Sequence, residues 1–267
     1  MGYITDLIKE LGSEDFQVES RAREKLVEIG RPAVPYLVSQ LQTKEVKMRT
    51  SVMYTLAWIK DFRSTPFVLK MLKDEDFHIR EIAAKLLGDL NYEWGLPELA
   101  LALRDVHYHV QSGAFYALAK IGKLSIPYLI EAAKDRDVHV RRGAMFGLRD
   151  QEDISTLPTA ISAFWDSDEF VREAAMQAIE HLVKSSKKTG ELDLIEKKIN
   201  SFFDRKGKKK PKKLLTSAIK VRLIRAKNDI AKRRDELAEE KSILLDESLK
   251  PPGPKGGMYK AGKIRNR

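Results

Sequence analysis

The stretch IPYLIEAAKDRDVHVRRGAMFGL, residues 126–148, contains two predicted helices joined by an acidic loop, and this pattern recurs along the chain. Its proline belongs to a series spaced by 31, 31, 30 and 31 residues: Pro35, Pro66, Pro97, Pro127 and Pro158. A period of this length is typical of stacked helical repeats, in which each unit buries its apolar side against its neighbours. Such an array presents a long surface instead of one enclosed pocket, so the period favours a binding protein over an enzyme.

A second apolar series sets the register of the first helix in each repeat, helix A. Its members are Val18, Met48, Ile79, Val110, Val140 and Val171, each followed four residues later by Ala or Val and eight residues later by Leu or Ile. Apolar residues at i, i+4 and i+8 lie along one face of a helix. The series therefore predicts six A helices, with residues 4–11 before them as an N-terminal cap.

Each periodic proline predicts the start of the second helix, helix B, because proline fits the first helical turn, where its missing N–H loses no partner. Apolar residues at +2, +3 and +6 from the proline predict one buried stripe. The sixth repeat lacks the proline, and residues 192–203 are its predicted helix B. The loop after helix B carries aspartates, which we expect to cap the next helix A: Asp74, Asp76, Asp105, Asp135, Asp137, Asp166 and Asp168.

This pattern over residues 13–185 resembles the short HEAT-like repeat of the phycobilisome-lyase type, on stretches such as DRDVHVRRGAMFGL (135–148) and IPYLIEAAKD (126–135). The resemblance implies an all-α, right-handed solenoid of about six helical hairpins. It leaves the function open, because that family includes scaffolds, pigment-attachment factors and a metal hydroxylase. The histidine–glutamate pairs that hold iron in the hydroxylases have no counterpart here, since the chain contains no His-Glu dipeptide.

The composition limits the chemistry. The chain has no cysteine, which excludes disulfides and thiolate metal sites and fits a reducing compartment. The start, MGYITDLIKE, does not have the pattern of a signal peptide, and no run reaches the roughly 18 apolar residues of a membrane span. No phosphate-binding loop, nucleophile elbow or HExxH motif occurs. We therefore expect an intracellular, cytoplasmic protein without catalytic residues, bound metal or cofactor.

The charge is distributed unevenly. Residues 204–267 contain 21 Lys and Arg against 8 Asp and Glu, whereas residues 1–203 contain 28 against 31. Such asymmetry predicts a polyanionic partner for the basic part. It also divides the chain into a repeat array (1–203), a basic linker (204–213), a basic amphipathic helix (214–249) and a basic tail (250–267) that we expect to be disordered.

The basic extension is the candidate nucleic-acid site, with RNA favoured over DNA because flexible basic segments can fold on structured RNA. Its Lys and Arg would contact phosphates, which gives salt-sensitive binding with little sequence information. An acidic protein surface, or no specific partner, remains an alternative. The predicted contact residues are Arg205, Lys206, Lys208, Lys209, Lys210, Lys212, Lys213, Arg222, Arg225, Lys232, Arg233 and Arg234.

The predicted helix over 214–249 has a leucine and isoleucine series seven residues apart: Leu223, Ile230, Leu237 and Leu244. This spacing fits a short coiled coil, although Arg233 and Glu240 occupy the alternate positions that a coiled coil fills with apolar side chains. A helix that docks on the end of the array, or is only partly folded, and a cationic helix on a membrane surface are the other interpretations. We expect a monomer, with the short coiled coil as the alternative.

The array has its own candidate site on the exposed positions of helix B, at +1, +4 and +5 from each proline. These positions form a weakly apolar concave face with aromatic residues, as protein-binding patches do. The alternative is that the +1 residues only pack against the neighbouring repeat. The predicted partner-binding residues are Tyr36, Phe67, Met71, Leu101 and Tyr128.

Two polar series follow the loop edge. Arginines recur one residue after the helix A anchor, at Arg49, Arg80, Arg141 and Arg172, and Glu19 and Gln111 interrupt the series. We expect them to pair with loop aspartates of their own or the next repeat. Histidines precede the anchor at His78, His109 and His139, too far apart to share a zinc ion because packed helices are separated by about 8–10 Å.

Together these features predict a non-catalytic adaptor that binds a protein through the array and nucleic acid through the basic extension. Two alternatives remain open at this point. One is a pure protein scaffold with a solubilising tail, and the other is a lyase-type or other enzyme of the same repeat family.

Overall fold

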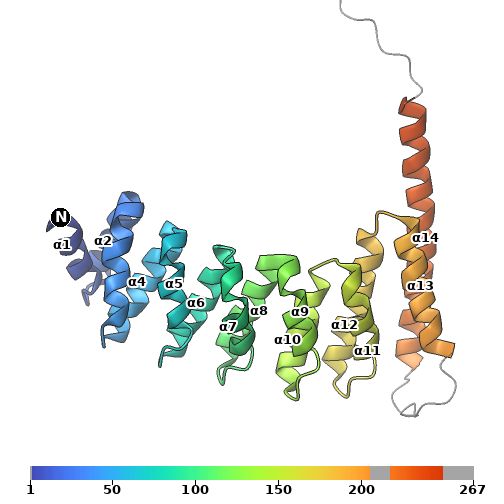
Figure 1. Ribbon diagram of the computed structural model, residues 1–267, viewed down its shortest axis with the longest axis horizontal. Coiled ribbons are helices and arrows are strands. Elements are labelled where there is room, and N and C mark those ends of the chain that lie inside the picture. The colour runs from blue at the N-terminus through green and yellow to red at the C-terminus, as the bar shows by residue number, and fades with distance from the viewer. Residues whose placement is uncertain (1, 205–216, 249–267) are drawn as a thin grey trace, which may run out of the picture.

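The computed structural model describes residues 2–204 and 217–248, and all regular structure in these ranges is helical (Figure 1). The predictions for Arg205–Lys213 and for the tail 250–267 lie outside the described residues. Helix α1 (Gly2–Leu11) precedes six helical hairpins. Their A helices are α2 (Phe16–Ile29), α4 (Val46–Ile59), α6 (Phe77–Asp89), α8 (Tyr108–Ile121), α10 (Val138–Arg149) and α12 (Glu169–Ser185).

The B helices are shorter, except for the last. They are α3 (Val34–Ser39), α5 (Thr65–Met71), α7 (Leu96–Ala102), α9 (Ile126–Ala132), α11 (Leu157–Ala163) and α13 (Thr189–Asp204). Short 3₁₀ turns precede the first five: Arg31–Ala33, Phe62–Ser64, Glu93–Gly95, Gly122–Ser125 and Ile154–Thr156; another, Gln40–Gln42, follows α3. Each periodic proline lies in the first turn of its B helix, as predicted. The hairpins stack side by side, which confirms the all-α solenoid.

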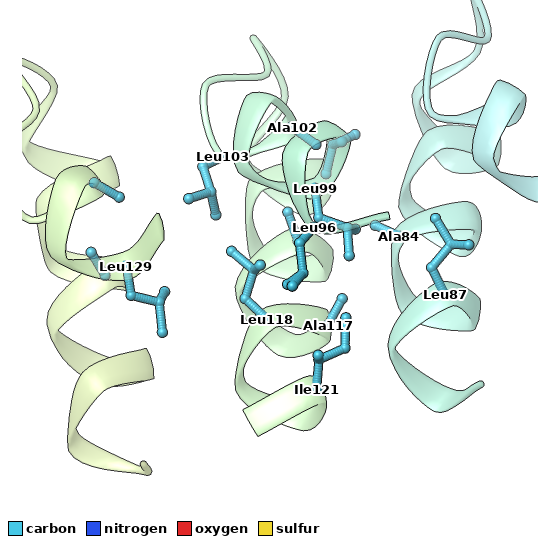
Figure 2. Packing of buried hydrophobic residues seen from close by; sticks show 14 of the residues in the cluster. Ala84, Leu87, Leu96, Leu99, Ala102, Leu103, Ala117, Leu118, Ile121 and Leu129 are labelled. Carbon is cyan, nitrogen blue, oxygen red and sulfur yellow. The ribbon is translucent and has the colours of Figure 1, made fainter. Parts of the chain in front are cut away.

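The helix A register is buried as the sequence predicts. The anchors of the last four repeats, and every residue four positions after an anchor, have no exposed surface. Val18 and Met48 are only half-buried. Figure 2 shows Leu99 from α7 next to Leu118 from α8, with Leu87 on the neighbouring α6; all three belong to one cluster of buried apolar side chains.

The loop aspartates have two different tasks. Asp76, Asp137 and Asp168 cap the following A helix by accepting hydrogen bonds from its first N–H groups. Of the aspartates that stand two residues before an N-cap residue, Asp74, Asp105 and Asp166 instead receive a bidentate pair of N–H groups from an arginine of the preceding repeat. Arg49 binds Asp74 at 2.9 and 2.9 Å, Arg80 binds Asp105 at 2.7 and 2.9 Å, and Arg141 binds Asp166 at 2.7 and 2.9 Å.

This arginine ladder confirms the predicted pairing for Arg49, Arg80 and Arg141, each of which joins its repeat to the next, whereas Arg172 donates to the backbone carbonyls of Asp166 and Ser167. Burial alone would raise the pKa of the Asp105 carboxyl, but the hydrogen bonds from Arg80 and from the His107 N–H outweigh it and hold that pKa below its usual value. Gln111 interrupts the ladder. Its side chain donates to the Asp105 carbonyl at 2.8 Å, and Asp135 is instead bound by the half-exposed Arg104 at 2.6 Å.

The array ends in two long helices. α13 and α14 (Ser217–Ser248) pack against each other, and α14 also contacts α12 before extending well beyond the array (Figure 1). Ala226 and Ile230 of α14 are fully buried, and Leu237 packs against the core. In the described residues, therefore, the apolar series of this helix docks on the end of the array. The side chains of Leu223 and Leu244 lie outside the described residues.

Candidate functional site

The predicted exposure of helix B residues is wrong at the +5 position from the proline. Phe67 and Leu101 are exposed, and Tyr36 and Tyr128 are half-buried against the core. Met71 is buried, with 7% of its surface exposed, so its predicted exposure is wrong. At about 100° per residue, the +5 position lies about 60° from the buried +2 position, whereas +4 lies about 40° from the exposed proline. Ala102 and Ala132, also at +5, are buried for the same reason.

A shallow apolar groove of about 400 Å³ lies between α3 and α5 on the helix B side. Phe67 forms one of its walls, and the aliphatic side chains of α3 form the other. Arg63 places a charged side chain at its margin. The residues that line the groove are Val34, Pro35, Val38, Ser39, Arg63 and Phe67.

A larger groove, of about 490 Å³, lies between α8 and α10 and reaches the first turn of α12. The buried anchor series does not predict it, because the aromatic residues of helix A lie outside that series; Tyr116 and Phe146 share a separate register, six residues after an anchor. Gly143 of α10 makes room for the Phe115 ring, which a side chain at position 143 would overlap. The rings that line the groove are Tyr108, Phe115, Tyr116, Phe146 and Phe170.

Two polar side chains of this aromatic groove, Arg142 and Tyr116, bind acids of the chain. Arg142 donates to both carboxylate oxygens of Asp168, at 2.8 and 2.5 Å, and lies 4.5 Å from the centre of the Phe170 ring. Hydrogen bonds from Arg142 lower the pKa of Asp168 to about 2. The Tyr116 hydroxyl donates to Asp89 at 2.7 Å, and this bond raises the pKa of the tyrosine. The rings therefore present a fixed apolar surface with its charges already neutralised.

The histidines form an exposed edge and do not converge. Phe77 stacks on His107 with ring centres 4.4 Å apart and lies 3.9 Å from the ring of His78. Across the described ranges, no three His, Asp or Glu side chains are grouped so that they could hold a metal ion.

The four described arginines and lysines of the predicted nucleic-acid site divide into two pairs. Arg234 binds Asp193 and Glu196 of α13 at 2.6 and 2.7 Å, and Arg233 binds Glu236 and Glu240. The ion pairs of Arg234 join α14 to α13, those of Arg233 lie within α14, and both guanidinium groups are occupied. Arg225 and Lys232 are exposed. The side chain of Arg222 lies outside the described residues.

The comparisons agree with this architecture. The profile of HEAT repeats matches residues 4–88, 65–149 and 96–180, which together cover more than half of the chain. The chain therefore belongs to the HEAT repeat family. It has the fold of a repeat scaffold. No curated protein sequence matches it. None of the described helices is both long and apolar enough to cross a membrane.

Solved structures extend the likeness of fold. The archaeal HEAT-like repeats protein from Thermococcus onnurineus NA1 is 15% identical over 86% of this chain and 97% of that one, with a TM-score of 0.53. A chain in the complex of Kap95p with RanGDP is 15% identical over 92% of this chain and 38% of that one, with a TM-score of 0.56. A chain in the complex of CpcE and CpcF of phycocyanin lyase from Nostoc sp. PCC7120 is 16% identical over 84% of this chain and 93% of that one, with a TM-score of 0.43.

Proposed function

We propose that this chain is a non-catalytic adaptor whose repeat array binds a protein partner through its concave helix B face and whose basic C-terminal extension contacts nucleic acid. The apolar groove between α3 and α5 is the observation that carries the first part. Phe67 and Leu101 keep 39% and 66% of their surfaces exposed on this side, and exposed aromatic and aliphatic side chains beside a groove are typical of partner-binding patches. Tyr36 and Tyr128 flank them, half-buried.

The nucleic-acid contact rests on charge. Seven of the nine residues from Arg205 to Lys213 are basic, and the exposed Arg225 and Lys232 of α14 add to them. Each phosphate that a cation neutralises releases counterions, which makes the binding depend steeply on salt. RNA is favoured over DNA, because a basic segment can adapt to a folded RNA. Arg233 and Arg234 are left out of this surface because acids of the chain bind them at 2.6–3.1 Å, whereas Lys232 lies 3.9 Å from Glu236 and stays exposed.

The partner surface is tested by affinity purification of the full chain from its own cells, with and without nuclease. A Phe67→Ser/Leu101→Ser variant should lose the captured protein while keeping its melting temperature, because both side chains are exposed. The matched control is Tyr108→Ser/Phe146→Ser, which changes the aromatic groove between α8 and α10. If only the control variant loses the partner, the protein binds the helix A side and the concave-face assignment is wrong.

The nucleic-acid contact is tested with a labelled single-stranded RNA and a DNA of the same sequence. The full chain should bind both, with RNA tighter, and log K should fall linearly with log salt. Replacing Lys208, Lys209 and Lys210 by Gln should flatten that slope by about 0.7 for each phosphate that is no longer neutralised. An unchanged slope would leave the chain as a protein scaffold with a solubilising extension. Iron or pigment that copurifies with the chain would instead favour the enzyme or lyase alternative.

A further inference from the structure

Arg172 occupies the ladder position of the sixth repeat, and its guanidinium is only half used. In the three paired arginines of the ladder, Nε and Nη2 bind the two oxygens of one aspartate, while Nη1 donates to a backbone carbonyl of the loop before the helix. Arg172 keeps the second part of this arrangement. Its Nη1 donates to the carbonyls of Asp166 and Ser167, at 2.8 and 3.0 Å. Its guanidinium is therefore anchored to the loop in the same way as those of its counterparts.

The acid that fills this place in the other repeats is missing at the end of the array. Each paired arginine binds the aspartate 25 residues after it, whereas the residue 25 after Arg172 is Lys197, inside α13. Among the described residues, no carboxylate accepts a hydrogen bond from Nε or Nη2 of Arg172, which we call its open edge. Arg172 keeps part of its surface exposed. The open edge therefore offers two parallel N–H groups, which in the three counterparts hold two oxygens of one anion.

The chain that follows α13 determines which kind of anion this end attracts. The C-terminal end of α13 lies on the edge of the array that carries the acidic loops and the ladder (Figure 1). From this edge the other repeats continue through a loop rich in aspartate. After α13 the chain continues instead through the basic linker, in which seven of the nine residues 205–213 are Lys or Arg. This concentration of positive charge attracts an anion that belongs to another molecule.

We propose that the open edge of Arg172 binds a backbone phosphate of the nucleic acid that the basic extension contacts. This inference rests on the proposed nucleic-acid contact and extends it from the extension onto the folded array. A guanidinium presents two N–H groups that fit two phosphate oxygens, whereas the lysines of the linker act as point charges. The bonds to the loop carbonyls already hold the side chain in place, so little conformational freedom is lost on binding. The contact positions the nucleic acid on the array and reads no sequence.

The test compares Arg172→Gln with the wild-type full chain, using the labelled single-stranded RNA. Gln111 stands at the corresponding position of α8 and still donates to the loop carbonyl at 2.8 Å. The substitution should therefore keep the loop anchored and remove only the open edge. We expect the RNA affinity to fall about tenfold and the salt slope to fall by about 0.7, at an unchanged melting temperature. Arg172→Lys keeps the charge without the paired N–H groups, so it should keep the slope and bind more weakly than the wild type.

Arg141→Gln is the matched control, because Asp166 already fills its edge. That variant should lose stability and keep the RNA affinity of the wild type. If Arg172→Gln binds RNA as tightly as the wild type, the phosphate site is wrong, while a flatter slope in the linker lysine variant still supports the adaptor proposal. If the wild type binds no RNA, the phosphate site and the proposed nucleic-acid contact both fail.

Two further results would assign the open edge to a carboxylate and overturn the proposal. One is a loss of stability in Arg172→Gln as large as that in Arg141→Gln, which would mean that an acid of the chain fills the edge; Asp204, which ends α13, would be the first to replace. The other is binding of polyglutamate that depends on Arg172 as strongly as RNA binding does, which would make the edge a contact for an acidic protein.

Discussion

The junction between the third and fourth repeats is close-packed, whereas the junction between the fourth and fifth is open. At the first, a Cβ atom added to Gly88 of α6 would lie 2.5 Å from the Cα of Ala117 in α8, so the two helix backbones nearly touch. At the second, the Phe115 ring stands between α8 and α10, and the aromatic groove lies beside it. Glycine thus has opposite effects at the two places. In α6 it draws two helices together, and in α10 it accommodates a ring that helps to line a groove.

The arginine ladder differs at the same two junctions. Arg80 of α6 binds Asp105, the aspartate before α8. The corresponding residue of α8 is Gln111, which cannot reach Asp135 before α10, and the exposed Arg104 takes its place. The ladder is intact between α6 and α8, where the helix backbones nearly touch. It is interrupted between α8 and α10, where the groove lies. Gln111, Phe115 and Gly143 all line this groove.

The largest expected effect is from Gly88→Val. The added carbons meet the backbone of α8, which cannot move without separating two repeats. We expect the free energy of unfolding to fall by about 3 kcal/mol, at the upper end of the range for overpacked cores. Thermal or urea unfolding measures it. Gly190→Ala in α13, where nothing lies within 4 Å, is the control and should not destabilise. Equal stability of both variants would show that the close approach is not a constraint.

Arg80→Met should destabilise by about 2 kcal/mol, between the values for exposed and buried ion pairs. The change leaves the carboxylate of Asp105 without its bidentate partner and the Asp74 carbonyl without a donor at 2.8 Å. Urea unfolding measures the loss. The exposed pair of Lys134 and Glu131 offers the control, since Lys134→Met should change stability little. If the two variants lose the same amount, the ladder contributes no more than a surface ion pair.

The close-packed junction was largely predictable from sequence, and the open one was not. Val110, Ala114 and Leu118 are spaced so regularly that their burial follows from the period alone. The Arg80 pairing followed from the charge pattern of the loops. The groove depends on where the Phe115 ring turns and on the lack of a Cβ at Gly143, and neither has a periodic signature. The exposure of Met71 was wrongly predicted because one residue rotates a side chain by 100°, enough to cross from the exposed to the buried face.

The C-terminal helix shows a different limit. Its apolar series at Ile230 and Leu237 fitted either self-association or docking, and the sequence carries no sign of which partner surface is nearer. The acids of α13 that receive Arg234 decide the matter in the described residues, and they are about forty residues away in the chain. Ion pairs between residues so far apart in the chain leave no local sequence pattern from which the docking of α14 could be predicted.

Gln111→Arg should close the gap in the ladder. The new guanidinium would lie where its counterparts in α6 and α10 do, and would bind Asp135. We expect a gain of less than about 1 kcal/mol, because Asp135 already has Arg104. A double-mutant cycle with Arg104→Met measures the exchange. Removing Arg104 should destabilise the wild type and leave the Gln111→Arg variant almost unchanged. A similar loss in both backgrounds would mean that position 111 cannot reach the aspartate.

The smallest effect, and the sharpest contrast with Gly88, is expected from Gly143→Ala. The added methyl overlaps the outer atoms of the Phe115 ring, which can rotate into the open groove. The steric strain is offset by the better helix propensity of alanine, so the net loss should stay below about 1 kcal/mol. In a Phe115→Ala background the ring is gone, and the same change should become stabilising, as for a glycine inside an unobstructed helix. Measured unfolding free energies of the four variants therefore report whether the ring alone opposes the methyl group. If Gly143→Ala destabilises equally in both backgrounds, the α10 backbone is constrained by something other than Phe115, and the two glycines act alike.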